Sequence, residues 1–188
     1  MSSATPGPTA PRWAWWVATG FGSGYLRPAP GTWGSLAAVA VWFSVTRLAE
    51  IGASTAWAEA VYFSQWAVLP VGITWGAIRA STLVGRETGL KDPSFIVADE
   101  WAGVWIALIP LALHIPATPI PLSWQFARLL TPFLLFRLFD IWKPWPVDQL
   151  QAFPGGWGIV LDDVMAGVYA AVPTFFADAA ILRWLMHR

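Results

Sequence analysis

The sequence predicts an all-α integral membrane protein, a helical bundle with four to five membrane-embedded helices and its polar motif loops on one face. Three observations support this fold class. Of the 188 residues, 56% are hydrophobic and only 12% are charged, whereas a soluble domain carries about 25% charged residues. Fifteen residues are tryptophan, which is enriched at membrane–water interfaces. The chain also contains several long apolar segments.

These apolar segments define the expected helices, since a membrane span needs about 20 mostly apolar residues. The expected helices cover residues 34–49, 57–78, 101–113, 124–142 and 164–182. The first segment is short and the fourth contains Arg128 and Arg137. Either of these two also fits a helix lying in the interface, so the expected count is four to five. Pro70, Pro110 and Pro173 predict kinks.

The remaining composition limits the domain organisation and the function. Residues 1–11 are rich in proline, serine and threonine and predict a disordered tail, followed by one membrane-embedded domain at residues 12–188. The chain has no cysteine, which excludes disulfides, zinc–thiolate sites and cysteine nucleophiles. A net charge of zero gives no reason to expect a nucleic-acid partner. The oligomeric state stays open.

Three connecting segments are rich in glycine, proline and charged residues: 11–33, 79–100 and 143–163. If five helices thread the membrane alternately, all three segments lie on one face. The basic residues on or near that face are Arg12, Arg27, Arg79, Arg86, Lys91, Arg137 and Lys143. Those toward the other face are Arg47, Arg128, Arg183 and Arg188. The positive-inside rule therefore predicts that the motif-bearing face is cytoplasmic.

Two pairs of carboxylates precede apolar segments in similar contexts. Asp99 and Glu100 lie in IVADEWAGV, and Asp162 and Asp163 lie in IVLDDVMAGV. Aligning Asp99 with Asp163 gives the shared pattern D-x-x-A-G-V followed by an aromatic residue. Carboxylates are favoured at helix N-termini, so one interpretation is that each pair only caps its helix.

The small residues that follow each pair favour a different interpretation. Gly103 and Gly167 would let the two helices pack closely, and that packing would bring the four carboxylates together. Clustered carboxylates repel each other unless they are protonated or neutralised by cations. Hard oxygen ligands suit Mg²⁺, or else Mn²⁺ or Ca²⁺. We therefore predict a metal site formed by Asp99, Glu100, Asp162 and Asp163.

Polar motifs elsewhere on this face are candidates for binding a phosphate. Gly31, Thr32 and Gly34, in PGTWGS, could form an anion-binding helix start, although this stretch taken alone favours an ordinary loop and helix cap. In FRLFDIWKPWPV, Asp140 and Lys143 follow an apolar helix, and Lys143 could pair with a phosphate, with Asp140, or simply reach the interface. The remaining candidates for meeting a phosphate are Arg79 and Arg86.

Four motifs occur in the order PGTWGSLAA, DPSFIVADEWAG, FRLFDIWKPWP and GGWGIVLDDVMAG. Together they resemble the phosphatidylglycerophosphatase A family. The resemblance implies a bacterial inner-membrane enzyme that requires Mg²⁺ and converts phosphatidylglycerophosphate to phosphatidylglycerol. Pro93 stands where some members have a histidine, which argues against a catalytic histidine there. The positions that match the family's motifs are Gly31, Thr32, Gly34, Asp99, Glu100, Asp140, Lys143, Asp162 and Asp163.

The predicted chemistry is metal-assisted hydrolysis of a phosphate monoester, with one or two Mg²⁺ and with either water or an aspartate as the nucleophile. The predicted catalytic residues are Asp99, Glu100, Asp140, Asp162 and Asp163. A membrane phosphatidyltransferase is an alternative, but its D-G-x-x-A-R string is absent. A small cation transporter is another, but it would place acids near the bilayer midplane.

Overall fold

The structure, a computed structural model, describes residues 9–51, 55–116 and 120–187. Within these ranges the chain folds into helices and loops and forms no strand. The predicted all-helical class is therefore confirmed. Most of the predicted tail, residues 1–8, lies outside the described residues.

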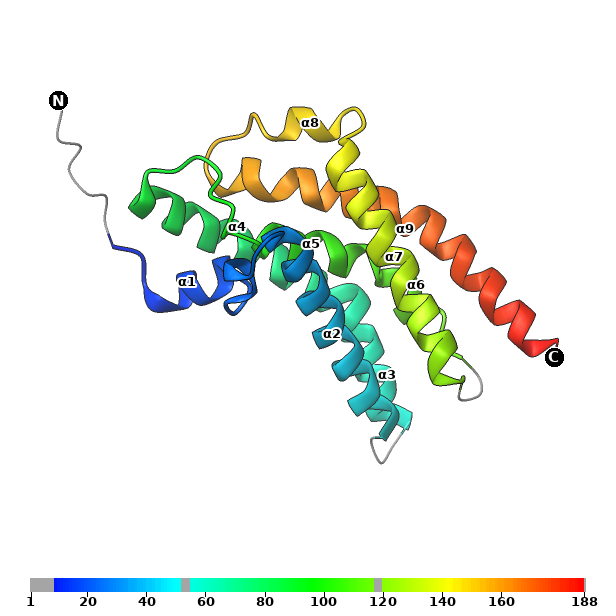
Figure 1. Cartoon of the computed structure of the whole chain (residues 1–188). Coiled ribbons are helices and arrows are strands. Elements are labelled where there is room, and N and C mark those ends of the chain that lie inside the picture. The colour runs from blue at the N-terminus through cyan, green and yellow to red at the C-terminus, as the bar shows by residue number, and fades with distance from the viewer. Residues whose placement is uncertain (1–8, 52–54, 117–119, 188) are drawn as a thin grey trace, which may run out of the picture.

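The N-terminal half contains a short helix followed by two long ones (Figure 1). The first long helix, α2, begins at Pro30, a residue suited to the first helical turn because it lacks an N–H group. The second long helix is continuous from Thr55 to Thr88 and includes a π-helical segment. The elements are α1 (Arg12–Ala18), η1 (Ser23–Tyr25), α2 (Pro30–Ile51), α3 (Thr55–Phe63), η2 (Ser64–Val68) and α4 (Leu69–Thr88).

The C-terminal half places a short central helix between longer ones (Figure 1). The helix that begins at Ala98 ends at Ala107, and a new one starts before Pro110, which has no N–H group to continue the first. The elements are α5 (Ala98–Ala107), α6 (Ile109–Leu113), α7 (Leu122–Trp142), α8 (Val147–Leu150) and α9 (Gly156–Met186). All five expected segments lie in helices.

Two helix boundaries differ from the prediction in ways that matter for the site. The second apolar helix continues ten residues beyond Ile78 to Thr88, so Arg79 and Arg86 lie on α4 and not in a loop. Gly89 ends it in the left-handed conformation (φ 67°), with its N–H donating to the Gly85 carbonyl at 2.9 Å.

The last helix begins at Gly156, eight residues before the expected Val164. Asp162 and Asp163 therefore lie well inside α9, so the prediction that they mark a helix start is wrong. Gly155, at φ 61°, turns the chain into the helix. A Cβ on Gly156 would clash with the Ile78 carbonyl of α4, so contact with α4 fixes where α9 starts.

The central helix α5 packs against α2, α4, α7 and α9. The predicted glycine contact between α5 and α9 is confirmed. A Cβ on Gly167 would meet the backbone of Gly103, and one on Gly103 would meet the Phe136 ring and the Asp163 carbonyl. The close approach of these backbones brings the first turn of α5 beside the acidic part of α9.

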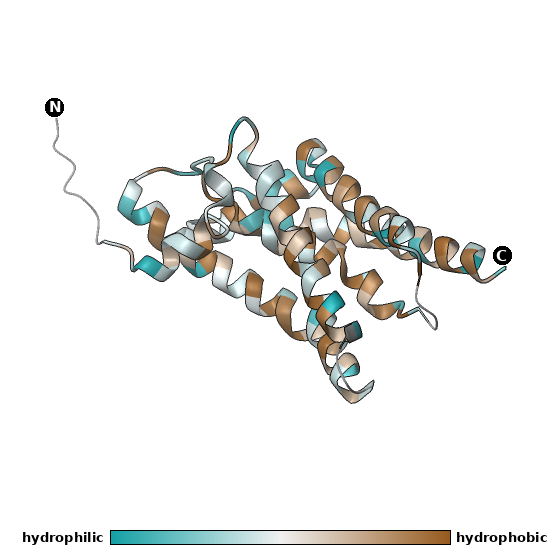
Figure 2. Ribbon diagram, turned by 60° about the horizontal axis from the view of Figure 1, so that its bottom comes forward, coloured by the Kyte–Doolittle hydropathy of each residue, from teal (hydrophilic) through white to brown (hydrophobic). Residues whose placement is uncertain are grey.

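Two helices, Thr55–Thr88 and Gly156–Met186, are long and apolar enough to cross a membrane. Only 33% and 28% of their most apolar 18-residue windows are buried within the protein, unlike core helices of a soluble domain. Apolar residues predominate along α9 toward the C-terminus (Figure 2). Exposed apolar side chains also follow one face of α7 at Leu122, Phe126, Leu130, Leu134 and Leu138. Four to five spans remain a prediction.

A buried ionic cluster joins α7, α9 and the end of α6. The Arg128 guanidinium donates to both carboxylate oxygens of Asp178, from Nη2 at 3.0 Å, and also to the His114 carbonyl at 2.9 Å. His114 Nδ1 lies 3.1 Å from Asp178 Oδ2. Arg128 and Asp178 are 8% and 2% exposed, so this is a fully paired charge cluster in the interior.

Candidate active site

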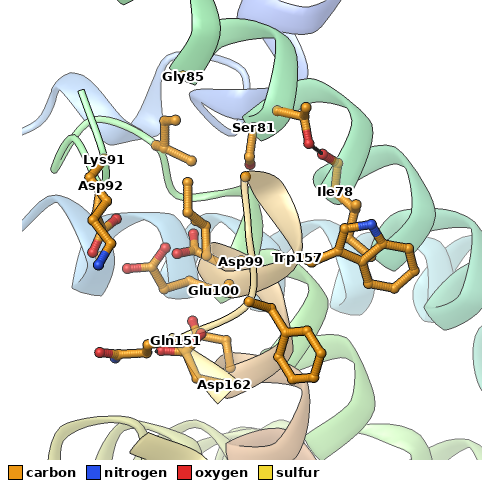
Figure 3. Close-up of a pocket in the computed structure, with 18 of the residues that line it drawn as sticks. Ile78, Ser81, Gly85, Lys91, Asp92, Asp99, Glu100, Gln151, Trp157 and Asp162 are labelled. Carbon is orange, nitrogen blue, oxygen red and sulfur yellow. Dashed lines mark hydrogen bonds between the residues drawn. The ribbon is translucent and has the colours of Figure 1, made fainter. Parts of the chain in front are cut away.

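A pocket of about 1400 Å³ lies among the polar segments of the chain (Figure 3). Each of the three segments predicted to share a face contributes to its lining: Pro30 to Thr32 from the first, Arg79 to Glu100 in part from the second, and Lys143 to Asp163 in part from the third. These three segments, far apart in the sequence, therefore lie close together in the fold. Their position relative to a membrane stays a prediction.

Three carboxylates come together in this pocket: Asp99 and Glu100 from the first turn of α5, and Asp163 from α9. One oxygen from each lies within 4.8 Å of the other two. Among the described residues, Asp99 Oδ1 and Glu100 Oε2 are buried without a hydrogen-bond partner. A buried acceptor without a partner is costly, so this arrangement fits a bound cation.

The raised pKa values of the two α5 carboxylates also fit a bound cation. Burial raises the pKa of Asp99 well above its usual range, and the neighbouring Glu100 raises it further. Burial also raises the pKa of Glu100. Without a cation, these groups would hold protons near neutral conditions more readily than exposed carboxyls do.

Asp162, a predicted metal ligand, lies outside this three-carboxylate group. Its Oδ2 accepts hydrogen bonds from Lys143 Nζ at 2.6 Å and from Gln151 Nε2 at 2.8 Å. Burial by itself lowers the pKa of Lys143, but the hydrogen bond and charge of Asp162 outweigh it and raise the pKa. Asp162 Oδ1 is buried without a partner. Lys143 therefore enters the pocket as a charged, fixed cation.

Arg137 joins α7 to the acidic group, a role that the sequence reasoning missed. Its Nη1 lies 2.8 Å from Asp140 Oδ2 and 3.9 Å from Glu100 Oε1. Both Arg137 and Asp140 line the pocket. The signal was present, since Arg137 and Asp140 are three residues apart on one helix face in the FRLFD motif.

The PGT motif forms the first turn of α2 beside the acidic group. A Cβ on Gly31 would clash with Glu100 Oε1 and approach Arg137 Nη1 to 3.3 Å. Gly31 and Thr32 line the pocket, whereas Gly34 does not. A Cβ on Gly34 would instead meet the Val97 side chain, so Gly34 allows α2 to pack beside the start of α5.

Helix α4 and the loop after it supply another side of the pocket. Arg79, Arg86 and Lys91 line it and are exposed, and the Arg79 guanidinium lies 5.3 Å from the ring centroid of Trp75. Figure 3 shows Ser81 and Gly85 on α4 and Lys91 on the following loop. Both predicted phosphate-binding arginines thus reach the same pocket as the carboxylates.

The sequence model of the phosphatidylglycerophosphatase A family matches residues 16–178. Proteins named phosphatidylglycerophosphatase A from Haemophilus influenzae and Escherichia coli are 36% and 33% identical to this chain. Those alignments cover 90% and 85% of this chain and 89% and 80% of the relatives. A Bacteroides thetaiotaomicron protein named as a candidate phosphatidylinositol-3-phosphatase is 37% identical over 90% of this chain and 93% of its own. No solved structure matches.

Proposed function

Because this chain belongs to the phosphatidylglycerophosphatase A family, we propose that it hydrolyses the phosphate monoester of phosphatidylglycerophosphate to give phosphatidylglycerol. Family membership makes the chain a phosphoric monoester hydrolase, as the sequence predicted. One observation carries the choice of site: three carboxylates with oxygens within 4.8 Å of one another share a pocket with two paired cations, Lys143 and Arg137.

The proposed cofactor is Mg²⁺, held by Asp99, Glu100 and Asp163. The support is chemical: carboxylate oxygens are the ligands that Mg²⁺ prefers, and two of these residues have buried oxygens without a partner among the described residues. When bound, the cation would act as a Lewis acid that stabilises the charge of the phosphoryl group. Asp162 is engaged by Lys143 and Gln151, and we leave it out of the ligand set.

The chain's own residues have separate roles in this proposal. Lys143, with its pKa raised by Asp162, stays charged and binds the phosphate monoester. Arg137, fixed by Asp140, holds a second positive charge beside Glu100 and stabilises the transition state. Hydrolysis breaks the bond between phosphorus and the glycerol oxygen, forms one to a water oxygen, and returns a proton to the alcohol of phosphatidylglycerol.

We further propose a multi-pass protein in the bacterial inner membrane with the pocket on the cytoplasmic side. A helix rises about 1.5 Å per residue, so Thr55–Thr88 and Gly156–Met186 exceed the roughly 30 Å of a bilayer's hydrocarbon core. The pocket-lining residues lie at the C-terminal end of the first and the N-terminal end of the second. These ends can therefore project beyond the hydrocarbon core on the same side, where a lipid phosphate resides.

A second candidate substrate is a phosphorylated inositol lipid. The Bacteroides thetaiotaomicron relative is named for such a lipid, and about 1400 Å³ of pocket exceeds the usual 300–1,000 Å³ of small-molecule sites. The chemistry at the phosphate monoester would be the same, and only the headgroup would differ. Direct comparison of the two lipids decides between these candidates.

The test is phosphate release by purified protein in neutral detergent micelles, with phosphatidylglycerophosphate or phosphatidylinositol 3-phosphate as substrate. We expect release from phosphatidylglycerophosphate in Mg²⁺ and none in EDTA, with activity restored when Mg²⁺ is added back. The Asp99→Asn, Asp163→Asn double variant should be inactive while remaining folded. Preference for the inositol lipid, or full activity in EDTA, would contradict the substrate or the cofactor assignment respectively.

A further inference from the structure

The cations of the pocket fall into two groups that differ in their partners. Arg137 and Lys143 each form an ion pair with a carboxylate of the pocket. Arg79, Arg86 and Lys91, on α4 and the loop after it, form no ion pair with any carboxylate of the described residues. The pocket therefore has three cations on its α4 side that are not held by an ion pair with its acidic group.

The acidic residues next to this second group in the sequence form no ion pair with it. Glu87, next to Arg86, accepts hydrogen bonds from Ala10 N at 2.8 Å and from Trp15 Nε1 at 2.9 Å, which ties it to the α1 region. Asp92, next to Lys91, also lines the pocket, but it forms no ion pair with Arg79, Arg86 or Lys91. The α4 cations thus face the pocket without an ion-paired carboxylate among the described residues.

Ser81 adds an independent indication of a ligand. Its side chain is fully buried and lines the pocket, and its hydroxyl oxygen has no hydrogen-bond partner among the described residues. The other hydroxyl on this face, Thr82 Oγ1, donates to the Ile78 carbonyl and accepts from Gly156 N. A buried hydroxyl without a partner is unfavourable, so Ser81 is a group that a bound molecule would satisfy.

The proposed substrate contains a second anion in addition to the phosphate that is removed. Its glycerol headgroup links a phosphate monoester to a phosphodiester, which joins the headgroup to the diacylglycerol. We propose that Arg86, Lys91 and Ser81, supported by Arg79, form a subsite for this phosphodiester, while the acidic group and Lys143 engage the monoester. This proposal rests on the proposed function and makes these residues determinants of substrate specificity.

The subsite predicts discrimination against phosphatidic acid, which carries a phosphate monoester directly on the diacylglycerol and has no phosphodiester. In neutral detergent micelles, the Arg86→Gln, Lys91→Gln double variant should lose about tenfold or more in kcat/KM for phosphatidylglycerophosphate, because charge-assisted hydrogen bonds are the strong ones. Its kcat/KM for phosphatidic acid with the same acyl chains should change less than about twofold. Arg86→Lys, Lys91→Arg should restore most of the activity.

The matched control is Arg27→Gln, which removes an exposed cation that does not line the pocket. Inhibition by phosphatidylglycerol, which retains the phosphodiester, gives a second measurement: its inhibition constant should rise by the same factor in the double variant. Ser81→Ala should produce a smaller change in the same direction.

Several outcomes would overturn the subsite. Equal losses for both lipids would show a general effect on the fold or on the catalytic group, and no loss for either would show that the α4 cations do not touch the substrate. A loss seen only in vesicles of anionic lipid would show that they contact the membrane surface. If the wild-type protein releases no phosphate from phosphatidylglycerophosphate, the proposed function itself fails.

Discussion

Helices α7 and α9 carry a charge cluster at each end, and the two clusters are built differently. At one end, Arg128 pairs with Asp178 and with the His114 carbonyl. At the other, Lys143 pairs with Asp162 while neighbouring carboxylates keep unpartnered oxygens. The cavity beside the first is only about 30 Å³, whereas the second opens into about 1400 Å³.

The difference separates structural charge from functional charge on the same pair of helices. Buried ions that are fully paired fix how the helices that carry them pack. Removing one partner destabilises the fold, because the other charge stays buried without compensation. Buried carboxylates in excess of their cations are unfavourable until something binds. The Arg128 cluster is thus fully paired without a ligand, whereas the proposed cation would neutralise the Asp99 group. Three substitutions and one addition of Mg²⁺ test this contrast.

The largest expected effect is on stability, from Arg128→Ala. It leaves the Asp178 carboxylate buried without its main partner, which costs about 3–5 kcal/mol of unfolding free energy. Denaturation in detergent, followed by circular dichroism, measures this. Arg183→Ala, at an exposed position of α9, is the control and should change little. A loss below about 1 kcal/mol would mean that the cluster does not hold α7 against α9.

In the large pocket, Asp163→Asn should lower activity much more than stability. Loss of a ligand should lower kcat/KM by more than the roughly 10–100-fold typical of outer-shell partners, with little loss of stability. Phosphate release and thermal unfolding are measured on the same preparation. Asp148→Asn, at an exposed position of α8 that does not line the pocket, is the control. Activity near that of the wild type would remove Asp163 from the site.

Binding of a cation should stabilise the protein only through the carboxylates of the large pocket, and not through the Arg128 cluster. At a concentration 100 times its dissociation constant, Mg²⁺ should add about 2.7 kcal/mol to the unfolding free energy, measured as a rise in Tm. The Asp99→Asn, Asp163→Asn double variant should show no such rise, whereas Arg128→Ala should show it in full. An equal rise in the double variant would place the bound cation elsewhere.

The smallest expected effect comes from the contact that brings the two halves of the acidic group together. Gly167→Ala places a Cβ against the Gly103 backbone, and such overpacking costs about 1–3 kcal/mol. Activity should also fall, since α5 and α9 must separate. Gly72→Ala, where a Cβ meets nothing within 4 Å, is the matched control and should be neutral or slightly stabilising. Equal behaviour of the two variants would contradict the role of the glycine contact.

The sequence pattern predicted the helices and the glycine contact well. Long apolar segments indicate helices directly, and small residues indicate where two helix backbones can approach closely. The pattern also predicted that Asp99 and Asp163 meet, since both lie beside those glycines. The start of α9 was predicted too late because Gly156 is fixed by contact with Ile78, some eighty residues away. No local pattern carries that information.

The partition of charges inside the site depends on tertiary geometry in the same way. Asp162 and Asp163 are neighbours in sequence, but one faces Lys143 and the other faces Asp99 and Glu100. The pairing of Lys143 with Asp162 depends on how the chain turns after α7, where Lys143 adopts a left-handed conformation (φ 46°). The spacing of Arg137 and Asp140 on one helix could indicate their ion pair, but the approach of Arg137 to Glu100 crosses between helices and has no local signal.

The helix from Thr55 to Thr88, with its π-helical segment, makes the position of the pocket depend on the thickness of the bilayer. At 34 residues it is about 50 Å long, and its last turns carry Ser81 and Arg86 along the pocket. A helix of this length that crosses a thinner bilayer must tilt more to bury its apolar residues, and its pocket end would move with it. Headgroup recognition would then respond to lipid chain length, and activity in vesicles of graded acyl length would measure that response.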